Sequence, residues 1–247
     1  MIDPTTFEGF REHVSEERFR VLAQPIVDLA SGETLHHEWL VRFDHDDNVV
    51  DLIRPAEISG AIRDLDLSML ARAVLALNAE PNRTPIAVNL SGASFATPSF
   101  KHALTACIGA LRAAPEKLVI ELTESWDIRD LAQATDVLAM LRRRGHRICL
   151  DDVGSGAASI RYLRALPCDW LKIDGEFVAA AAENARDRAI LEAVLSLREP
   201  LNVRFIAEGI ENGNIMAAVR ELGFDAGQGY AIARPALSVP AVSAGCT

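Results

Sequence analysis

The chain has 247 residues, of which 49% are hydrophobic and 24% are charged, and its formal net charge is -10. This composition excludes a disordered chain, and the length is typical of a single α/β barrel domain. The acidic balance argues against binding to DNA or RNA polymers, which requires a basic face. The first residues lack the apolar core of a signal peptide, and no stretch reaches ~18 uninterrupted apolar residues. We therefore expect a cytoplasmic domain without a membrane span.

The chain opens with two strand-like segments around a turn at Ala30-Ser31-Gly32, which predict a β-hairpin. Beyond it, short apolar runs typical of strands alternate with longer helical patterns. The strands are predicted at 19–27, 34–43, 85–90, 118–122, 147–150, 170–173, 203–207 and 226–229. The helices are predicted at 56–78, 98–112, 129–144, 157–166, 183–198 and 212–222.

Strands that alternate with helices of these lengths predict parallel strands joined by crossovers. An open doubly wound sheet is the competing architecture, but no GxGxxG motif follows the first strand. The opening hairpin reverses one strand relative to the others. We therefore predict an α/β fold, namely a TIM-like (β/α)8 barrel with one antiparallel strand.

Most of the predicted strands end in a polar or ionisable residue. In a parallel barrel the carboxyl ends of the strands converge on one rim, where active sites lie. The sequence thereby places around one mouth Asn89, Glu121, Asp151, Asp152, Lys172, Glu208 and Gln228. Glu38 and Arg42 share one face of their strand, because side chains alternate along a strand. Glu38 can therefore join this rim, with Arg42 beside it.

Carboxylates gathered in this way repel one another unless cations hold them. Oxygen ligands of this kind suit Mg²⁺ or Mn²⁺, and two such ions about 3.5–4 Å apart generate hydroxide and clamp a phosphodiester. Arg42 and Lys172 are suited to binding phosphate oxygens. Any single strand-end carboxylate could instead be a helix N-cap or a surface residue. We interpret His36 and His37 as structural, because their spacing matches no zinc motif. The residues alone thus indicate an acidic metal site on a barrel, without naming its substrate.

Eight short segments, spread over the chain, carry a resemblance to a known family. They are Gln24-Pro25-Ile26-Val27, Glu38-Trp39-Leu40-Val41-Arg42, Val88-Asn89-Leu90-Ser91, Glu121-Leu122-Thr123-Glu124-Ser125, Leu150-Asp151-Asp152-Val153-Gly154-Ser155-Gly156, Leu171-Lys172-Ile173-Asp174, Ala207-Glu208-Gly209 and Gln228-Gly229-Tyr230. Together they resemble the EAL-domain cyclic di-GMP phosphodiesterases. The resemblance implies a single EAL domain over residues 1–247, with a core of about 19–235 and short extensions at both ends. It also implies hydrolysis of cyclic di-GMP to linear pGpG.

The resemblance further implies a role for each site residue. The expected metal ligands are Glu38, Asn89, Glu121, Asp151 and Asp152. Asp151 is expected to bridge the two Mg²⁺ or Mn²⁺ ions of the site. The expected catalytic residues are Lys172 and Glu208, which orient or deprotonate the attacking water, and Glu124, which braces the loop 153–159. The expected substrate-binding residues are Gln24, Leu40, Arg42, Asp174 and Gln228. A homodimer is a further expectation from the family.

Departures from the family pattern motivate an alternative. The signature reads Glu38-Trp39-Leu40, and we expect Trp39 to point away from the metals. The loop after Asp152 lacks the usual Phe, Thr and Tyr-Ser pair, and the stretch after Glu57 is shorter. The alternative is a catalytically weak or inactive EAL domain that acts as a cyclic di-GMP receptor or a protein-interaction module. A metal-independent barrel hydrolase with two carboxylates, such as a glycosidase, is a third hypothesis.

Overall fold

The computed structural model describes residues 10, 14–16, 18–43, 49–96, 98–123, 131–154 and 159–237. Its strands are β1 (Phe19–Asp28), β2 (Thr34–Phe43), β3 (Ile86–Ser91), β4 (Leu118–Thr123), β5 (Arg147–Val153), β6 (Trp170–Ile173), β7 (Arg204–Ala207), β8 (Ala226–Gly227) and β9 (Ala236–Leu237). Its α-helices are α2 (Val49–Ser59), α3 (Ile62–Ala79), α4 (Pro98–Gly109), α5 (Leu131–Arg143), α6 (Ser159–Ala165), α7 (Gly175–Glu183), α8 (Ala185–Leu195), α9 (Arg198–Leu201) and α10 (Gly213–Glu221). Two 3₁₀ turns, η1 (Gly92–Ala96) and η2 (Pro115–Lys117), precede α4 and β4.

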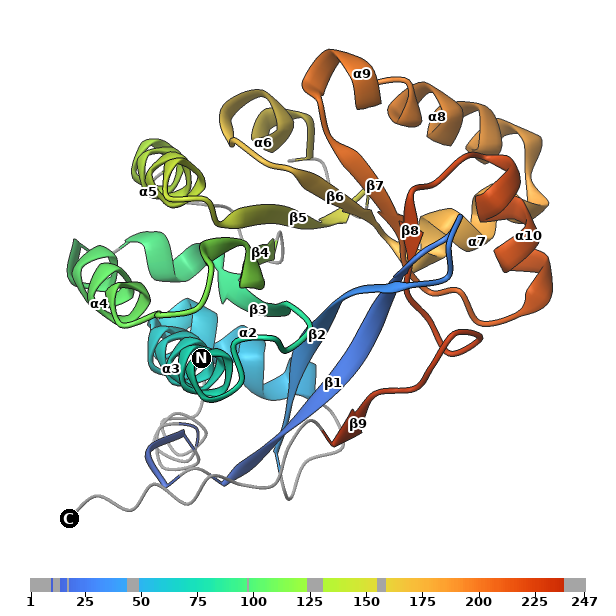
Figure 1. Ribbon diagram of the computed structural model, residues 1–247. Coiled ribbons are helices and arrows are strands. Elements are labelled where there is room, and N and C mark those ends of the chain that lie inside the picture. The colour runs from blue at the N-terminus through green and yellow to red at the C-terminus, as the bar shows by residue number, and fades with distance from the viewer. Residues whose placement is uncertain are drawn as a thin grey trace.

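The sheet closes on itself. Strands β2 to β8 are parallel, and each pairs with the next in chain order. Strand β1 is antiparallel to both β2 and β8 and completes the circle (Figure 1). This confirms the predicted (β/α)8 barrel with one antiparallel strand. Strand β9, which was not predicted, adds to β1 at Leu22 and Ala23.

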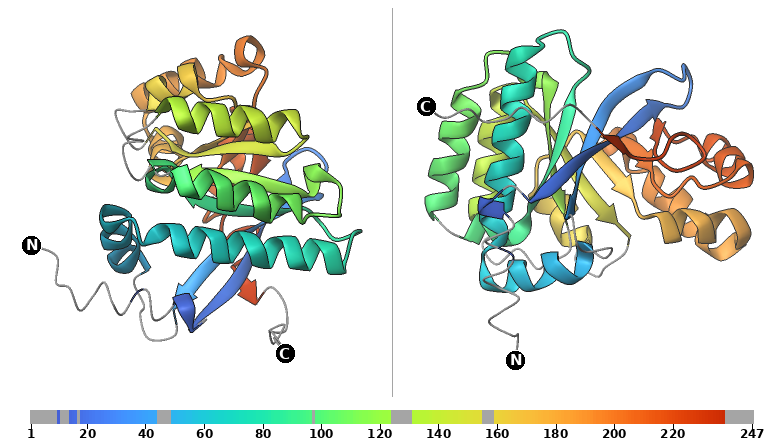
Figure 2. Two further views of the ribbon diagram at one scale, coloured as in Figure 1. Left: turned by 90° about the vertical axis from the view of Figure 1, so that its left-hand side faces the viewer. Right: turned by 90° about the horizontal axis from the view of Figure 1, so that it is seen from below.

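The barrel strands are apolar on both faces because helices cover the outside and a small plug fills the inside. Figure 2 shows α3, α4 and α5 lying side by side along one side of the barrel. The plug consists of Ile26, Ala87, Val119, Cys149, Trp170, Ile206 and Ala226. Alternate residues of a strand share a face, so the residues two positions after the plug also point inward. From β3 to β8 these are Asn89, Glu121, Asp151, Lys172, Glu208 and Gln228. The polar layer therefore lies directly above the apolar plug.

One predicted helix is two helices in the structure, and one helix was not predicted. The helix predicted at 56–78 is two helices, because the chain turns at Gly60 with φ +78°. A glycine adopts this left-handed conformation without a steric cost, and it ends α2. Helix α7 was not predicted at all. It ends before Asn184, whose side chain accepts a hydrogen bond from the Arg186 N–H (2.8 Å) and starts α8. Among the described residues, no helix is both long and apolar enough to cross a membrane.

A buried acidic pair anchors α2 and α3 to the end of β3. The Ser91 hydroxyl donates to Glu57 Oε1 (2.7 Å), and the Ser91 N–H donates to Asp66 Oδ2 (3.0 Å). The Ser94 hydroxyl donates to the same Asp66 oxygen (2.6 Å). Burial raises the pKa of Asp66 to about 7, although the hydrogen bonds from Ser94 and Ser91 oppose the shift. The folded protein therefore favours a protonated Asp66.

Asp66 gives the domain a testable pH dependence. Because its folded pKa lies above the ordinary value of 3.8, its stabilising contribution is complete at low pH and is lost as the pH rises through about 7. Asp66→Asn mimics the protonated side chain at every pH. The measured quantity is the free energy of unfolding of the variant minus that of the natural chain. We expect this difference to rise by roughly 2–3 kcal/mol from pH 5 to pH 8.5. Urea unfolding across this range measures the difference, and parallel stability curves would contradict it.

Candidate metal centre

Lys172 occupies the centre of the polar layer. Its ammonium nitrogen lies 3.2 Å from Glu38 Oε2, 3.2 Å from Glu121 Oε2, 2.9 Å from Asp151 Oδ1 and 2.7 Å from Glu208 Oε1. The Lys172 side chain is only 1% exposed, so these are buried contacts. One ammonium group faces four carboxylates, which leaves an excess of negative charge at the centre. Buried charge of this kind is stable only when it is compensated.

The pKa values express this excess of charge. Burial is the main cause that raises the pKa of Glu121 and Glu208 well above their ordinary value, while the Lys172 charge opposes it. Burial also disfavours the charged form of Lys172, but the surrounding carboxylates outweigh it and raise its pKa. For Glu38, burial is outweighed by Lys172 and by hydrogen bonds, and the pKa is lowered. At neutral pH the centre thus attracts protons or further cations.

An amide network holds Glu38 in place. Asn89 Nδ2 donates to Glu38 Oε1 (2.7 Å), and Gln228 Nε2 donates to Glu38 Oε2 (2.7 Å). Gln228 also donates to Gln24 Oε1 (3.1 Å), and Gln24 in turn donates to the Ala233 carbonyl (3.1 Å). These side-chain hydrogen bonds therefore link residues of β1, β2, β3 and the end of β8 at the mouth of the barrel.

Two groups of carboxylates could each hold a metal ion. Glu38, Glu121 and Asp151 offer oxygen atoms that lie within 4.8 Å of one another, and so do Asp151, Asp152 and Glu208. Asp151 belongs to both groups, as its predicted bridging role requires. Asn89 Oδ1 is buried and has no hydrogen-bond partner among the described residues. Free carboxylate and amide oxygens are what Mg²⁺ or Mn²⁺ requires, so the donor set fits these ions.

The backbone at Asp152 explains how two successive aspartates reach one mouth. Consecutive side chains of a regular strand point to opposite faces. Here Asp152 has φ +55°, and the pairing of β5 with β6 shifts register between Leu150 and Val153. This irregularity brings the Asp152 carboxylate close to that of Asp151. Burial first, and then the Asp151 charge, raises the pKa of Asp152 to about 6.

A contact between two glycines brings β6 and β7 together above the site. Gly209 follows Glu208 and has φ +61°, and a Cβ atom there would lie 2.8 Å from the Gly175 Cα atom. A Cβ atom on Gly175 would lie 3.0 Å from the Gly209 Cα atom. Neither position admits a side chain without moving backbone, which keeps Glu208 within reach of Lys172.

The remaining predicted residues lie at the edge of the centre or beyond it. Leu40 and Arg42 line a cleft of about 200 Å³ that also reaches Asn89. Asp174 caps α7, because its Oδ1 accepts from the N–H groups of Glu176 (3.1 Å) and Phe177 (3.0 Å). Its predicted role was substrate binding, and the capping role was missed. Glu124 and residues 155–158 of the predicted loop lie outside the described residues.

Two residues of β2 complete the description. Trp39 points outward as predicted, since it is 5% exposed within the core between barrel and helices. His36 points inward, and its Nε2 atom lies 3.7 Å from Glu121 Oε1. The sequence interpretation missed this contact. The available signal was the even spacing between His36 and Glu38, which places both on the inner face.

Comparison with known proteins identifies the architecture. The EAL domain family model matches residues 8–235. This chain belongs to the EAL domain family. Four carboxylates of its predicted site surround Lys172, namely Glu38, Glu121, Asp151 and Glu208.

Several relatives of the EAL domain have been named or solved. The chain is 34% identical over 230 residues to an uncharacterized signaling protein of Caulobacter vibrioides and 31% identical over 239 residues to the cyclic di-GMP phosphodiesterase NbdA of Pseudomonas aeruginosa. These matches cover 92% of this chain but only 28% and 30% of the relatives. The structure of the PaMucR phosphodiesterase in its c-di-GMP complex is 28% identical, with a TM-score of 0.82 over 95% of this chain and 98% of that one.

Proposed function

We propose that this domain hydrolyses cyclic di-GMP to linear pGpG with the help of two Mg²⁺ or Mn²⁺ ions. The observation that carries the proposal is the pair of carboxylate groups that share Asp151 around Lys172. Its similarity to proteins named as cyclic di-GMP phosphodiesterases supports the choice of substrate. The cytoplasmic location, the homodimer and the lack of DNA or RNA binding stay predictions from the sequence.

The metal-binding residues would be Glu38, Asn89, Glu121 and Asp151 on one side and Asp151 with Asp152 on the other. Bound cations would activate a water molecule and neutralise the charge that develops on the phosphate. The buried carboxylates exclude bulk water and hold this arrangement before the substrate binds. These cations would thereby compensate the excess negative charge at the centre.

Glu208 and Lys172 would handle the proton of the attacking water. Glu208 would accept this proton, because its carboxylate lies beside Lys172 and within the same group as Asp151 and Asp152. The water oxygen then forms a bond to phosphorus, and the bond from phosphorus to the 3′ oxygen breaks. The leaving oxygen takes up the proton that Glu208 accepted from the water, and the ring opens to pGpG. Lys172, which contacts Glu208 at 2.7 Å, would stabilise the Glu208 carboxylate before it accepts the proton and again once it has released the proton.

The substrate would be held by the residues at the edge of the mouth. Arg42 is suited to a phosphate oxygen, because a guanidinium group forms paired hydrogen bonds with phosphate. Leu40, beside it in the cleft, offers an apolar surface to a nucleobase. Gln24 and Gln228 are already joined by a hydrogen bond and present a polar wall next to Glu38.

A hydrolysis assay on the purified domain tests the proposal. We expect cyclic di-GMP to be converted to pGpG in Mg²⁺ or Mn²⁺ and to remain intact in EDTA. Calorimetry with cyclic di-GMP runs in parallel. Binding without turnover would replace the proposal by a receptor function, and the absence of both would favour a protein-interaction module. Turnover that survives EDTA would instead indicate a metal-independent hydrolase.

A further inference from the structure

His36 lies below the metal centre, beside Trp170 of the apolar plug. It is 3% exposed and precedes Glu38 by two positions on the inner face of β2. Its ring packs edge-on against the Trp170 ring, with 5.9 Å between centroids and an interplanar angle of 71°. Its Nε2 atom lies 3.7 Å from Glu121 Oε1. His36 thus supports Glu121 from the side opposite the mouth.

The two facing atoms are both unsatisfied. Within the described part of the chain, neither His36 Nε2 nor Glu121 Oε1 has a hydrogen-bond partner. The other oxygen of Glu121 is held by Lys172 at 3.2 Å. A buried carboxylate oxygen without a hydrogen-bond partner destabilises the folded state, and more so when it is charged. A movement of a few tenths of an ångström would satisfy both atoms at once.

We propose that His36 is a positioning residue, whose Nε2–H group holds Glu121 Oε1 so that the other carboxylate oxygen faces the metal. This inference rests on the proposed metal-dependent function. Carboxylates that bind metals are themselves oriented by hydrogen bonds from a second layer of residues, and the loss of such a partner typically costs about 10–100-fold in metal affinity. A neutral imidazole has one N–H donor, and the proposal places this donor on Nε2, the nitrogen that faces Glu121.

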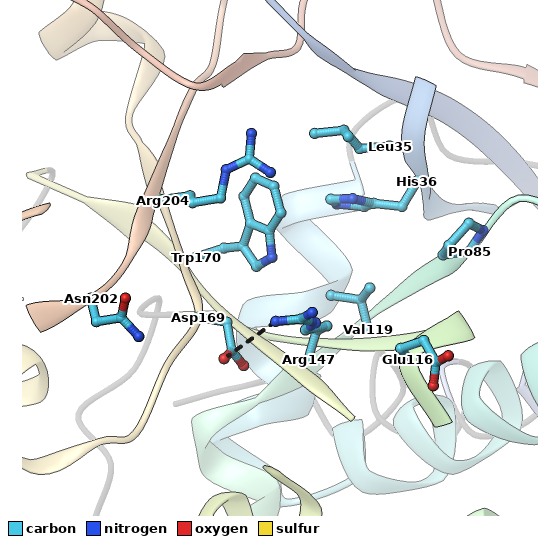
Figure 3. A pocket seen from close by; sticks show the side chains of 10 residues that line it. All are labelled: Leu35, His36, Pro85, Glu116, Val119, Arg147, Asp169, Trp170, Asn202 and Arg204. Atoms are coloured by element: carbon cyan, nitrogen blue, oxygen red, sulfur yellow. Dashed lines mark ion pairs between the residues drawn. The ribbon is translucent and has the colours of Figure 1, made fainter. Parts of the chain in front are cut away.

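The other side of His36 faces a cleft at the amino ends of the strands. This cleft has a volume of about 390 Å³, and Trp170, Val119, Arg147 and Arg204 are among its lining residues (Figure 3). Figure 3 shows the Arg204 guanidinium over the Trp170 ring, and its central carbon lies 4.5 Å from the ring centroid. Removal of the His36 imidazole would extend this cleft toward Glu121. A small molecule could then enter the vacated space from the solvent.

Mg²⁺ affinity, measured by calorimetry on metal-free protein, tests the role of His36 without an activity assay. His36→Leu keeps the volume but removes the N–H group, and we expect it to weaken Mg²⁺ binding roughly tenfold. His36→Gln places an amide N–H near the position of Nε2, and we expect it to bind Mg²⁺ within about threefold of the natural chain. His37→Ala, on the outer face of the same strand, is the matched control. Equal affinity of the Leu variant and the natural chain would overturn the inference.

Chemical rescue separates hydrogen bonding from space filling. At pH 8.5 we expect imidazole to restore Mg²⁺ affinity to His36→Ala, because imidazole supplies a ring N–H. Its N-methyl derivative fills the same space but lacks this donor, and we expect no restoration. Restoration by both compounds, or by neither, would overturn the inference. If the natural chain itself binds no Mg²⁺, the proposed function fails together with this inference. If the natural chain binds Mg²⁺ and the His36 variants bind it equally well, only the inference fails.

Discussion

Asp151→Asn is expected to abolish both Mg²⁺ binding and cyclic di-GMP hydrolysis. Asp151 belongs to both carboxylate groups, so its loss removes a ligand from each of the two predicted ions. The loss of an outer-layer partner alone costs up to about 100-fold, so the loss of a shared ligand should exceed that factor. The side chain keeps its shape in this variant, which leaves the packing of β5 intact.

The loss should not come from unfolding. Burial raises the pKa of Asp151 and the Lys172 charge opposes that shift, so a neutral side chain here relieves repulsion among the remaining carboxylates. We therefore expect the metal-free Asp151→Asn domain to unfold at the same urea concentration as the natural domain, or at a higher one. Asp136→Asn, on the exposed side of α5, serves as the control for the chemical change. Hydrolysis by Asp151→Asn within threefold of the natural rate would contradict the shared-ligand assignment.

The positions of the site residues follow from two rules that apply to sequence alone. Carboxyl ends of parallel strands converge, and alternate residues share a face. These rules placed Asn89, Glu121 and Asp151 around one mouth, and the barrel brings them together with Lys172. They work here because each strand is regular up to its inward polar residue. The same regularity puts an apolar residue two positions earlier, such as Val119 below Glu121.

Other features depend on contacts that sequence patterns do not encode. Asp152 turns toward the mouth only because the backbone is left-handed there and the strand pairing shifts. Asp174 was assigned to substrate binding, yet its carboxylate accepts two backbone N–H groups as the cap of α7. An aspartate that follows a strand can be either a helix N-cap or a ligand, and the sequence alone does not distinguish the two. His36 was interpreted as structural because its spacing matches no zinc motif, and its contact with Glu121 involves a strand that is distant in sequence.

Lys172→Met is expected to destabilise the metal-free domain more than any other single change at the site. The variant leaves Glu38, Glu121, Asp151 and Glu208 without the ammonium group that contacts all four. Removal of one partner from a buried charge pair costs about 3–5 kcal/mol, because the other charge remains buried and unpaired. Urea unfolding in EDTA measures this loss. Lys101→Met, on the exposed face of α4, controls for the substitution itself.

The pH and metal dependence of this loss identifies its cause. At pH 5 the carboxylates take up protons, so we expect a smaller loss of stability than at pH 8. Mg²⁺ should restore part of the stability at pH 8, because a cation that binds the folded state stabilises it and here replaces the missing positive charge. An equal loss at both pH values, unaffected by Mg²⁺, would mean that Lys172 contributes packing rather than charge. The expected pattern would show that Lys172 acts as an internal cation. Its charge then allows the chain to bury four carboxylates around one point before any metal binds.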